Sequence, residues 1–331
     1  MKAYIKAISY YLPEQVEKNQ NERLRQKTGI ERRHVSAVDE TAADMAAKAA
    51  EKLFETVSRD SIDYIIFCTQ SPDYYLPTSA CILQDRLRLS KHCGALDYNH
   101  GCTGYIYGLG LAKGIIESGQ AKNVLLLTAE TYSKYINTED QAVLPLFGDG
   151  ATATLVVGKI AATDGIYGFE YGTDGAGYRN LIVPVGGMRE RYQYTELKTT
   201  TDKYGNCRTN RNLFMDGGAI MDFALDVVPE TLDSILTKNS LTRQDIDYYV
   251  FHQANHFMLK SLQKICHLGK LPYWNDIKDY GNTVSNSIPI ALADMMKATE
   301  TTKLNRVVLM GFGVGLSWGG CIVDLSDVNQ Q

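Results

Sequence analysis

One cysteine stands where a nucleophile would be expected. Cys102 comes shortly after the apolar stretch that ends at Asp97, and the helical pattern of 103–118 begins directly after it. At the start of a helix, the dipole and the free backbone N–H groups stabilise a thiolate, which is the nucleophilic form. An isolated cysteine is nevertheless more often a buried structural residue. The interpretation of Cys102 therefore depends on what else the chain supplies.

Two polar residues stand at similar junctions in the second half of the chain. His252 lies in FHQAN where an apolar stretch ends, and Asn282 lies in YGNTVSN. Each residue by itself indicates little, because histidine is often structural and asparagine is common in turns. Loops at strand ends, near the join of two α/β halves, are however the usual place for a site.

An internal repeat shows how these loops could be brought together. Three pairs of segments recur in the same order at nearly constant separation: IDYIIFCTQ (62–70) with IDYYVFHQA (246–254), Asp97-Tyr98 with Asp279-Tyr280, and Val124 with Val307. The repeat predicts an α/β arrangement of two duplicated halves, with helices between and outside two mixed or mostly parallel central sheets. We place the domain boundary so that 1–165 holds the cysteine and 166–331 holds the histidine and the asparagine.

The periodicity of apolar residues places the elements. Strands are predicted at 3–11, 62–70, 94–98, 123–131, 147–158, 246–254, 305–313 and 319–325. Helices are predicted at 41–57, with Thr41 as N-cap, and at 77–89, 103–118, 217–238, 256–267 and 287–299. Residues 14–28 are expected to form a loop with a short helix.

Composition narrows the class of protein. The 331 residues are enough for two domains with a large core, and 44% hydrophobic with 22% charged residues is typical of soluble globular proteins. The net charge of -4 gives no basis for binding nucleic acid or an anionic membrane. No signal peptide or membrane-spanning segment is recognisable. Seven scattered cysteines, without zinc spacing, predict reduced thiols, a cytoplasmic protein and no metal. No cofactor is expected.

The motifs together resemble those of the thiolase-fold condensing enzymes, and most closely β-ketoacyl-acyl carrier protein (ACP) synthase III. The matching segments are TGIERRH (28–34), GCTGY around Cys102, FGDGA (147–151), FHQAN around His252, GNT around Asn282 and GFGVGLSWG (311–319). They follow the family's order with similar separations, over nearly the whole chain. The resemblance implies a homodimeric acyltransferase that acts on ACP or coenzyme A (CoA) thioesters, in fatty acid or specialised-metabolite biosynthesis.

The resemblance also implies a reaction in two steps. Cys102 would take an acyl group from a thioester, and the enolate of a decarboxylated malonyl thioester would then attack the acyl-cysteine. His252 and Asn282 would donate hydrogen bonds to the malonyl thioester oxygen as negative charge develops on it. The oxyanion of acyl transfer would be held by the backbone N–H groups of Cys102 and of Val314, which replaces a glycine of the family.

Several further residues are assigned to the substrate site through the same resemblance. They are Asn255, Leu76, Arg23, Gln141 and Phe147. Leu76 would cross to the partner's site and close the acyl pocket of the homodimer. Arg23 and Gln141 stand where acetyl-CoA-primed members have a Trp and an Arg around the adenine, so the aromatic platform is absent.

Two other departures concern the surface. Phe257 replaces a basic residue that helps to dock acidic ACP, although Lys260 and Lys264 are nearby, and the loop at 186–212 is longer than in the housekeeping enzyme. We interpret the chain as a specialised paralogue that uses free acetyl-CoA poorly. The sequence leaves the acyl donor open.

Two alternative functions remain at this point. The same three residues could transfer an acyl group to an O, N or non-malonyl carbon nucleophile, with His252 as general base. A thiolase-fold subunit that only binds a partner is disfavoured, because such subunits usually lose the nucleophile and Cys102 is present. Release of carbon dioxide from a malonyl thioester distinguishes condensation from simple acyl transfer.

Overall fold

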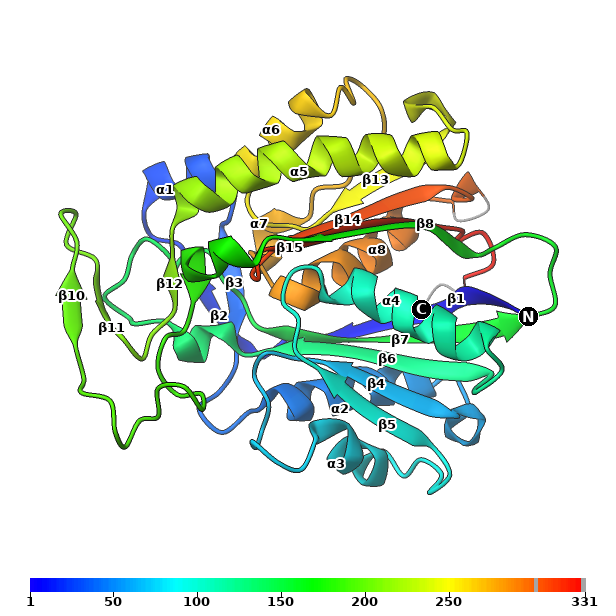
Figure 1. Cartoon of the computed structure of the whole chain (residues 1–331), viewed down its shortest axis with the longest axis horizontal. Coiled ribbons are helices and arrows are strands. Elements are labelled where there is room, and N and C mark those ends of the chain that lie inside the picture. The colour runs from blue at the N-terminus through cyan, green and yellow to red at the C-terminus, as the bar shows by residue number, and fades with distance from the viewer. Residues whose placement is uncertain (301–302, 329–331) are drawn as a thin grey trace.

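The computed structural model describes residues 1–300 and 303–328, and it contains two central sheets (Figure 1). The first sheet has the strand order β1-β7-β6-β4-β5 and the second has the order β13-β14-β15-β8. The strands of the first sheet are β1 (Lys2–Tyr11), β4 (Tyr64–Cys68), β5 (Gly94–Tyr98), β6 (Asn123–Glu130) and β7 (Gly150–Lys159). Those of the second sheet are β8 (Ile166–Thr173), β13 (Tyr248–Phe251), β14 (Val307–Gly313) and β15 (Ser317–Val323).

The two sheets share one plan. In the first, β4 runs parallel to β6, and β6 runs antiparallel to β7. In the second, β13 runs parallel to β14, and β14 runs antiparallel to β15. A bridge from Tyr249 to Tyr273 takes the place of the parallel pairing of β4 with β5. The predicted duplication and the mixed sheets are therefore confirmed, while the division into two domains at 165 remains a prediction.

Helices fill three layers around the sheets, as Figure 1 shows. The middle layer holds α4 (Gly104–Glu117) and α8 (Ser287–Ala298), which contact strands of both sheets. The outer layers are α2 (Ala42–Phe54) with α3 (Ser79–Arg86), and α5 (Gly217–Lys238) with α6 (His256–Ile265). Thr41 caps α2 in a capping box with Asp44, as expected at that position. Because α4 and α8 are covered on both sides, their apolar residues join a single core cluster with both sheets.

The short helix expected within 14–28 is α1 (Glu22–Thr28). Several other short elements are not predicted: β2 (Gln15–Lys18), β3 (Arg32–Val35), β9 (Leu181–Ile182), β10 (Thr199–Thr201), β11 (Cys207–Thr209), β12 (Phe214–Met215) and α7 (Ile277–Tyr280). The hairpin of β10 and β11 lies within the polar loop 186–212 and projects from the body (Figure 1). Polar strands of three residues lack the apolar alternation by which a strand is recognised.

The larger predicted elements occur, with corrected ends. The strand predicted at 62–70 is confined to β4, and the strand predicted at 246–254 is confined to β13. The strand predicted at 319–325 begins and ends two residues earlier, as β15. The first correction has a clear cause, because the N–H of Gln70 donates to the carboxylate of Glu130 instead of to a neighbouring strand. The polar residues after each strand thereby become loop residues that can face a cavity.

Candidate active site

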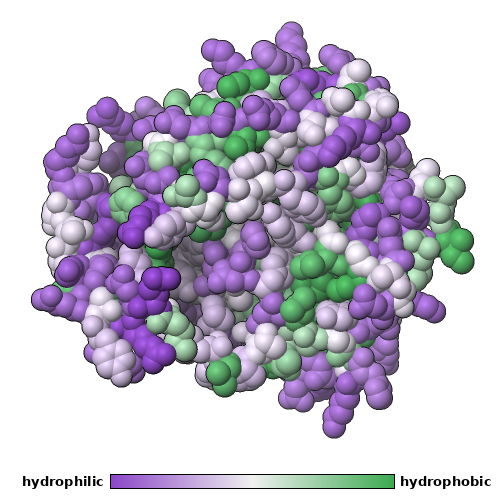
Figure 2. All heavy atoms as spheres, viewed as in Figure 1, coloured by the Kyte–Doolittle hydropathy of each residue, from purple (hydrophilic) through white to green (hydrophobic). Residues whose placement is uncertain are grey.

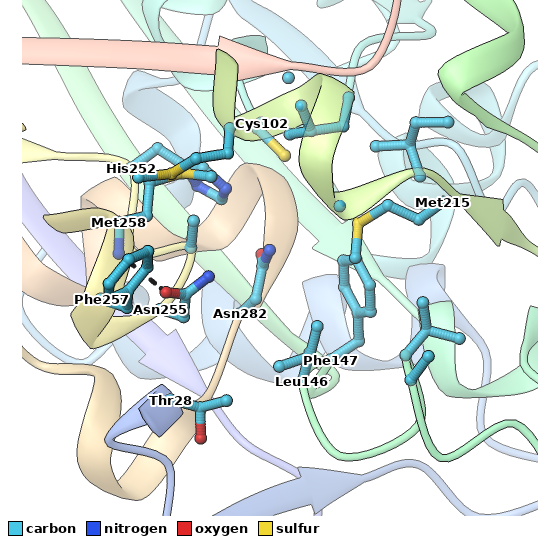
Figure 3. Close-up of a pocket in the computed structure, with 18 of the residues that line it drawn as sticks. Thr28, Cys102, Leu146, Phe147, Met215, His252, Asn255, Phe257, Met258 and Asn282 are labelled. Atoms are coloured by element: carbon cyan, nitrogen blue, oxygen red, sulfur yellow. Dashed lines mark hydrogen bonds between the residues drawn. The ribbon is translucent and has the colours of Figure 1, made fainter. Parts of the chain in front are cut away.

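A cavity of about 470 Å³ brings the three predicted residues together. Cys102, His252 and Asn282 all line it, and their side chains converge at one end (Figure 3). Cys102 comes from the turn between β5 and α4, His252 directly follows β13, and Asn282 follows α7. Residues far apart in the sequence therefore meet where strands of the two sheets end. Most of the remaining wall is apolar, with Phe147, Leu146, Met215, Phe257 and Met258.

The Cys102 side chain is held between backbone groups. It is 5% exposed, and the N–H groups of Cys102 and Val314 both hydrogen-bond its sulfur. These are the two N–H groups that the sequence assigned to the oxyanion of acyl transfer. Gly313 makes the close approach possible, because a Cβ there would lie 2.9 Å from Sγ of Cys102. The pair of N–H groups can therefore stabilise negative charge on sulfur or on an oxygen bonded next to it.

The position of Cys102 at a helix start predicts a stabilised thiolate, but in the structure the pKa of this thiol is raised. Burial, reinforced by the negative charge of Glu130, raises the pKa of Cys102 to about 12, and the two N–H groups only partly offset this. The helix that follows begins at Gly104, with Thr103 as its N-cap. The stabilisation that a helix start gives to a thiolate is therefore smaller than the cost of removing that thiolate from water in this closed site. The resting form is the thiol, and acylation requires a small thiolate population.

His252 is held as a neutral hydrogen-bond donor. It is 2% exposed, and burial lowers the pKa of its imidazole to about 3. Its Nδ1 lies 2.7 Å from Oγ of Ser287, which also accepts the N–H of Gln253 at 3.3 Å. Among the described residues, Nδ1 is the acceptor available to the Ser287 hydroxyl proton. The proton of the imidazole is then on Nε2, which has no partner among those residues and can donate into the cavity.

Asn282 is oriented by its own turn. Its Oδ1 accepts the N–H of Val284 at 2.9 Å, which identifies the oxygen of the amide and leaves Nδ2 without a partner among the described residues. Its backbone N–H donates to the carbonyl of Leu146 at 2.8 Å. The preceding Gly281 has a φ of 66°, and a Cβ there would lie 2.7 Å from that carbonyl. Asn282 therefore supplies a second neutral N–H donor from the same wall as His252.

A buried carboxyl group lies behind the nucleophile. Glu130 ends β6 and is fully buried, and it accepts hydrogen bonds from the N–H of Gln70 and from the hydroxyls of Ser71 and Ser285. Burial raises the pKa of Glu130 to about 8 despite these donors. Near neutral pH this group is therefore mainly a neutral acid. Once ionised, it opposes formation of the Cys102 thiolate.

This coupling predicts how the reactivity of Cys102 depends on pH. Below about pH 8 the alkylation rate by iodoacetamide should rise about tenfold per pH unit with the thiolate fraction. Above it the rise should flatten, because Glu130 ionises and disfavours the thiolate. In Glu130→Gln the flattening should disappear, and Cys102→Ser gives the background from other cysteines. If the rate flattened near the same pH in the wild type and in Glu130→Gln, Glu130 would be excluded as the cause of the flattening.

Gly313→Ala should slow acylation of Cys102 about a hundredfold, because the new Cβ displaces the sulfur from its two N–H donors. The rate of acyl-mass gain on the intact protein measures this. The matched control is Gly114→Ala in α4, where a Cβ would meet nothing within 4 Å. Equal acylation rates for the two variants would show that the position of the sulfur is not limiting.

The other predicted substrate residues divide into two groups. Phe147 and Asn255 line the cavity, and Asn255 also caps α6 by accepting the N–H of Met258 at 2.9 Å (Figure 3). Arg23 and Gln141 are exposed and lie outside the lining, although their neighbours Leu24 and Ala142 belong to it. Leu76 is 81% exposed and does not line this cavity.

Sequence reasoning missed residues that act on the three predicted ones. Glu130, Ser287 and Gly313 set the charge, the tautomer and the space around them. A glutamate at the end of the apolar strand VLLLTAE was the one recognisable signal, because a carboxyl group there must be buried. Ser287 and Gly313 gave no such signal, since their effect depends on which side chain they face.

Within 1–300 and 303–328, no group of three or more His, Cys, Asp or Glu side chains is arranged to hold a metal ion. Over the same ranges, no helix combines the length and the hydropathy needed to cross a membrane.

Comparisons with known proteins identify the family. Models of "3-Oxoacyl-[acyl-carrier-protein (ACP)] synthase III" and of its C-terminal part match residues 96–175 and 236–325. A β-ketoacyl-ACP synthase III of Clostridioides difficile is 37% identical over 97% of this chain and 98% of its own. The relative from Clostridium perfringens is 36% identical over 92% of this chain and 91% of its own.

Solved structures agree. A crystal structure of a 3-oxoacyl-ACP synthase III superimposes with a TM-score of 0.94 and 45% identity, covering 98% of this chain and 100% of its own. The fold and the site therefore define a condensing enzyme of the thiolase fold. The chain belongs to the 3-oxoacyl-ACP synthase III family, which confirms the resemblance drawn from the motifs.

Proposed function

We propose that this enzyme transfers an acyl group from a thioester to Cys102 and then joins it to a malonyl thioester by decarboxylative Claisen condensation. In the first step the Cys102 thiolate attacks the thioester carbonyl and expels the donor thiol. The tetrahedral oxyanion is stabilised by the N–H groups of Cys102 and Val314, which already contact the sulfur. The product is an acyl-cysteine.

In the second step the malonyl thioester loses carbon dioxide, and the electron pair of the broken bond moves toward the thioester oxygen. His252 Nε2–H and Asn282 Nδ2–H donate hydrogen bonds to this oxygen. The enolate carbon then attacks the acyl-cysteine carbonyl, and the Cys102 thiolate leaves. The observation that carries the proposal is this pair of neutral donors, which lie beside a buried thiol and have no partner in the part of the chain that the structure describes.

Simple acyl transfer to an O or N nucleophile is the weaker proposal. It would use His252 as a general base, but burial lowers the pKa of this imidazole to about 3, so it holds a proton poorly. The deciding experiment follows carbon dioxide release from a malonyl thioester with and without an acyl donor. Release together with a 3-oxoacyl product is expected. Acyl transfer to an amine or alcohol without release would support the alternative.

A carrier protein is the proposed acyl donor. Arg23 and Gln141 provide no aromatic platform for adenine. Both are exposed, and their sequence neighbours Leu24 and Ala142 line the cavity. Lys260 and Lys264 are exposed on α6, the helix that also carries Phe257 of the cavity wall. An acidic carrier docked there would deliver only its thin prosthetic arm. Supplying the same acyl group on CoA and on ACP tests this, and a clear preference for CoA would contradict it.

We propose that the enzyme is a homodimer. The edge strand β5 pairs on one side with β4 and has no strand on the other within the described residues. Large side chains are exposed on β5 (Leu96, 37%), on α4 (Leu111, 39%) and on β8, the edge strand of the second sheet (Tyr171, 45%). Figure 2 shows a hydrophobic patch over α4. An open strand edge beside an apolar patch is a surface that a second copy can cover, and Leu76 would then reach the partner's site.

Light scattering should therefore give twice the chain mass of 36.8 kDa. Leu96→Lys on β5 should shift the protein toward monomer, because the interface would then bury two new charges, one from each subunit. Ile160→Lys, at an exposed position after β7, is the matched control and should remain dimeric. A monomeric wild type with full activity would contradict the dimer and the role of Leu76.

A cytoplasmic location is proposed as well. All seven cysteines are free, as expected in a reducing compartment.

A further inference from the structure

A second cavity lies on the other side of the nucleophile. It has a volume of about 790 Å³. Gly313 lines the first cavity, whereas the next two residues, Val314 and Gly315, line the second. Leu181 lines both. Because Gly313 and the N–H of Val314 both touch the sulfur of Cys102, the nucleophile stands at the partition between the two cavities.

The proposed function decides which group each cavity holds, and the present inference rests on it. During condensation, the malonyl thioester must reach the hydrogen-bond donors of His252 and Asn282, which line the first cavity. The acyl group already bonded to Cys102 must leave that space free. It therefore extends past Val314 into the second cavity.

The wall of the second cavity is unusually rich in tyrosine. Six of its lining residues are Tyr74, Tyr75, Tyr132, Tyr135, Tyr178 and Tyr192. Their rings offer flat aromatic faces and edges against which another ring can pack. The same wall also carries polar side chains, among them Gln70 and Asn99, and six aliphatic ones: Leu181, Ile182, Val183, Val185, Leu213 and Val314.

The tyrosines nearest the nucleophile have fixed rings. Tyr132 is 4% exposed, and its hydroxyl donates to Oε1 of Gln70. The hydroxyl of Tyr135 donates to the Gln70 carbonyl at 2.7 Å. The ring of Tyr132 lies 5.3 Å from that of Phe147 in the first cavity and 5.9 Å from that of Tyr135. An incoming group thus meets rings that need not rearrange to receive it.

Tyr178 and Tyr192 are the rim tyrosines of this cavity, and their hydroxyls are available to a ligand. The hydroxyls of Tyr178 and Tyr192 have no hydrogen-bond partner among the described residues, and both side chains are about half exposed. Nδ2 of Asn99 is also without a partner there, since Oδ1 accepts from Gln70 at 2.8 Å. A saturated chain reaching these groups would desolvate them without compensation, whereas an oxygen substituent would pair with them.

We propose that the second cavity selects an acyl group that carries an aromatic ring with a polar substituent at its far end. The ring packs between the tyrosine rings nearest Cys102, and the substituent meets the hydroxyls of Tyr178 and Tyr192. The acyl bond to Cys102 is the ordinary thioester of the first step, so this selection adds no chemistry to the reaction.

Two acyl groups of similar length test this selection. Hydroxyphenylpropanoyl and octanoyl groups are supplied as N-acetylcysteamine thioesters, whose short arm removes any effect of CoA or ACP docking. Both carbonyls carry a saturated carbon, so their intrinsic reactivities match. Mass gain at Cys102 of the intact protein should be at least about tenfold faster for the aromatic group.

The rim tyrosines provide the variants. Tyr178→Leu and Tyr192→Leu should each lower the aromatic-to-octanoyl rate ratio severalfold, because each removes a ring and a hydroxyl from the cavity. Tyr204→Leu is the matched control, since Tyr204 is 78% exposed in the hairpin loop and lies outside the cavity. Its ratio should equal that of the wild type.

The outcomes separate this inference from the proposed function. Equal or faster acylation by octanoyl, or an unchanged ratio in both cavity variants, would overturn the aromatic selection. The proposed condensation would still stand if the octanoyl-enzyme reacted with a malonyl thioester. Conversely, a selectively formed aromatic acyl-enzyme that released no carbon dioxide from a malonyl thioester would keep the selection and reject the condensation.

Discussion

Cys102→Ser is expected to abolish the acyl-enzyme and to lower the condensation rate by about 10,000-fold or more. A serine hydroxyl in this buried position has almost no alkoxide at neutral pH, and every later step requires the acyl-cysteine. Intact-mass measurement after incubation with an acyl thioester detects the missing adduct. Circular dichroism should show an unchanged fold, because serine is smaller than cysteine and the site is already partly polar.

A second cysteine provides the control for this experiment. Cys81→Ser changes an exposed cysteine at the start of α3 and should leave the adduct in place. An acyl adduct that persisted in Cys102→Ser and disappeared in Cys81→Ser would move the nucleophile to α3 and would contradict the site described above.

Replacing either donor to the malonyl oxygen should separate the two steps. His252→Ala and Asn282→Ala should each slow condensation about 100- to 1,000-fold, which is typical for the loss of one oxyanion donor. Acylation of Cys102 should change little, because its oxyanion is held by backbone N–H groups. Single-turnover measurements of mass gain and of carbon dioxide release report the two steps separately.

The controls for the donors test the assignment of roles. His92→Ala, at an exposed position before β5, should leave both steps unchanged. Ser287→Ala should slow only condensation, because it frees the imidazole to protonate Nδ1 instead of Nε2. A His252→Ala enzyme that could not be acylated at all would make His252 the base for Cys102 and would favour simple acyl transfer.

The sequence was sufficient for the three reacting residues because their signals are local. Cys102 and His252 each follow a predicted strand, and Asn282 follows the pair Asp279-Tyr280, which repeats the Asp97-Tyr98 pair before Cys102. A parallel pairing then brings such loops to the same end of the molecule. The larger elements could be predicted for the same reason, since helix α5 follows from its 3.6-residue apolar period at the observed bounds.

The missing parts depend on long-range environment. The pKa of Cys102 rises because the whole site is closed over it and Glu130 lies behind it, which no local pattern records. The tautomer of His252 depends on Ser287, a residue of another element. The sequence predicts a loop where the β10–β11 hairpin lies, because both strands are short and polar; β10 is exposed and β11 is only half-buried.

The central claim is tested most directly by a single turnover of isolated acyl-enzyme. Wild-type protein is acylated, freed of donor, and mixed with malonyl-ACP, and the Cys102 adduct, carbon dioxide and ACP-bound product are followed together. Decarboxylative condensation predicts that one carbon dioxide and one 3-oxoacyl-ACP appear for each acyl group lost from Cys102. An acyl-enzyme that survives malonyl-ACP, or that loses its acyl group to water, an amine or an alcohol without releasing carbon dioxide, would contradict it.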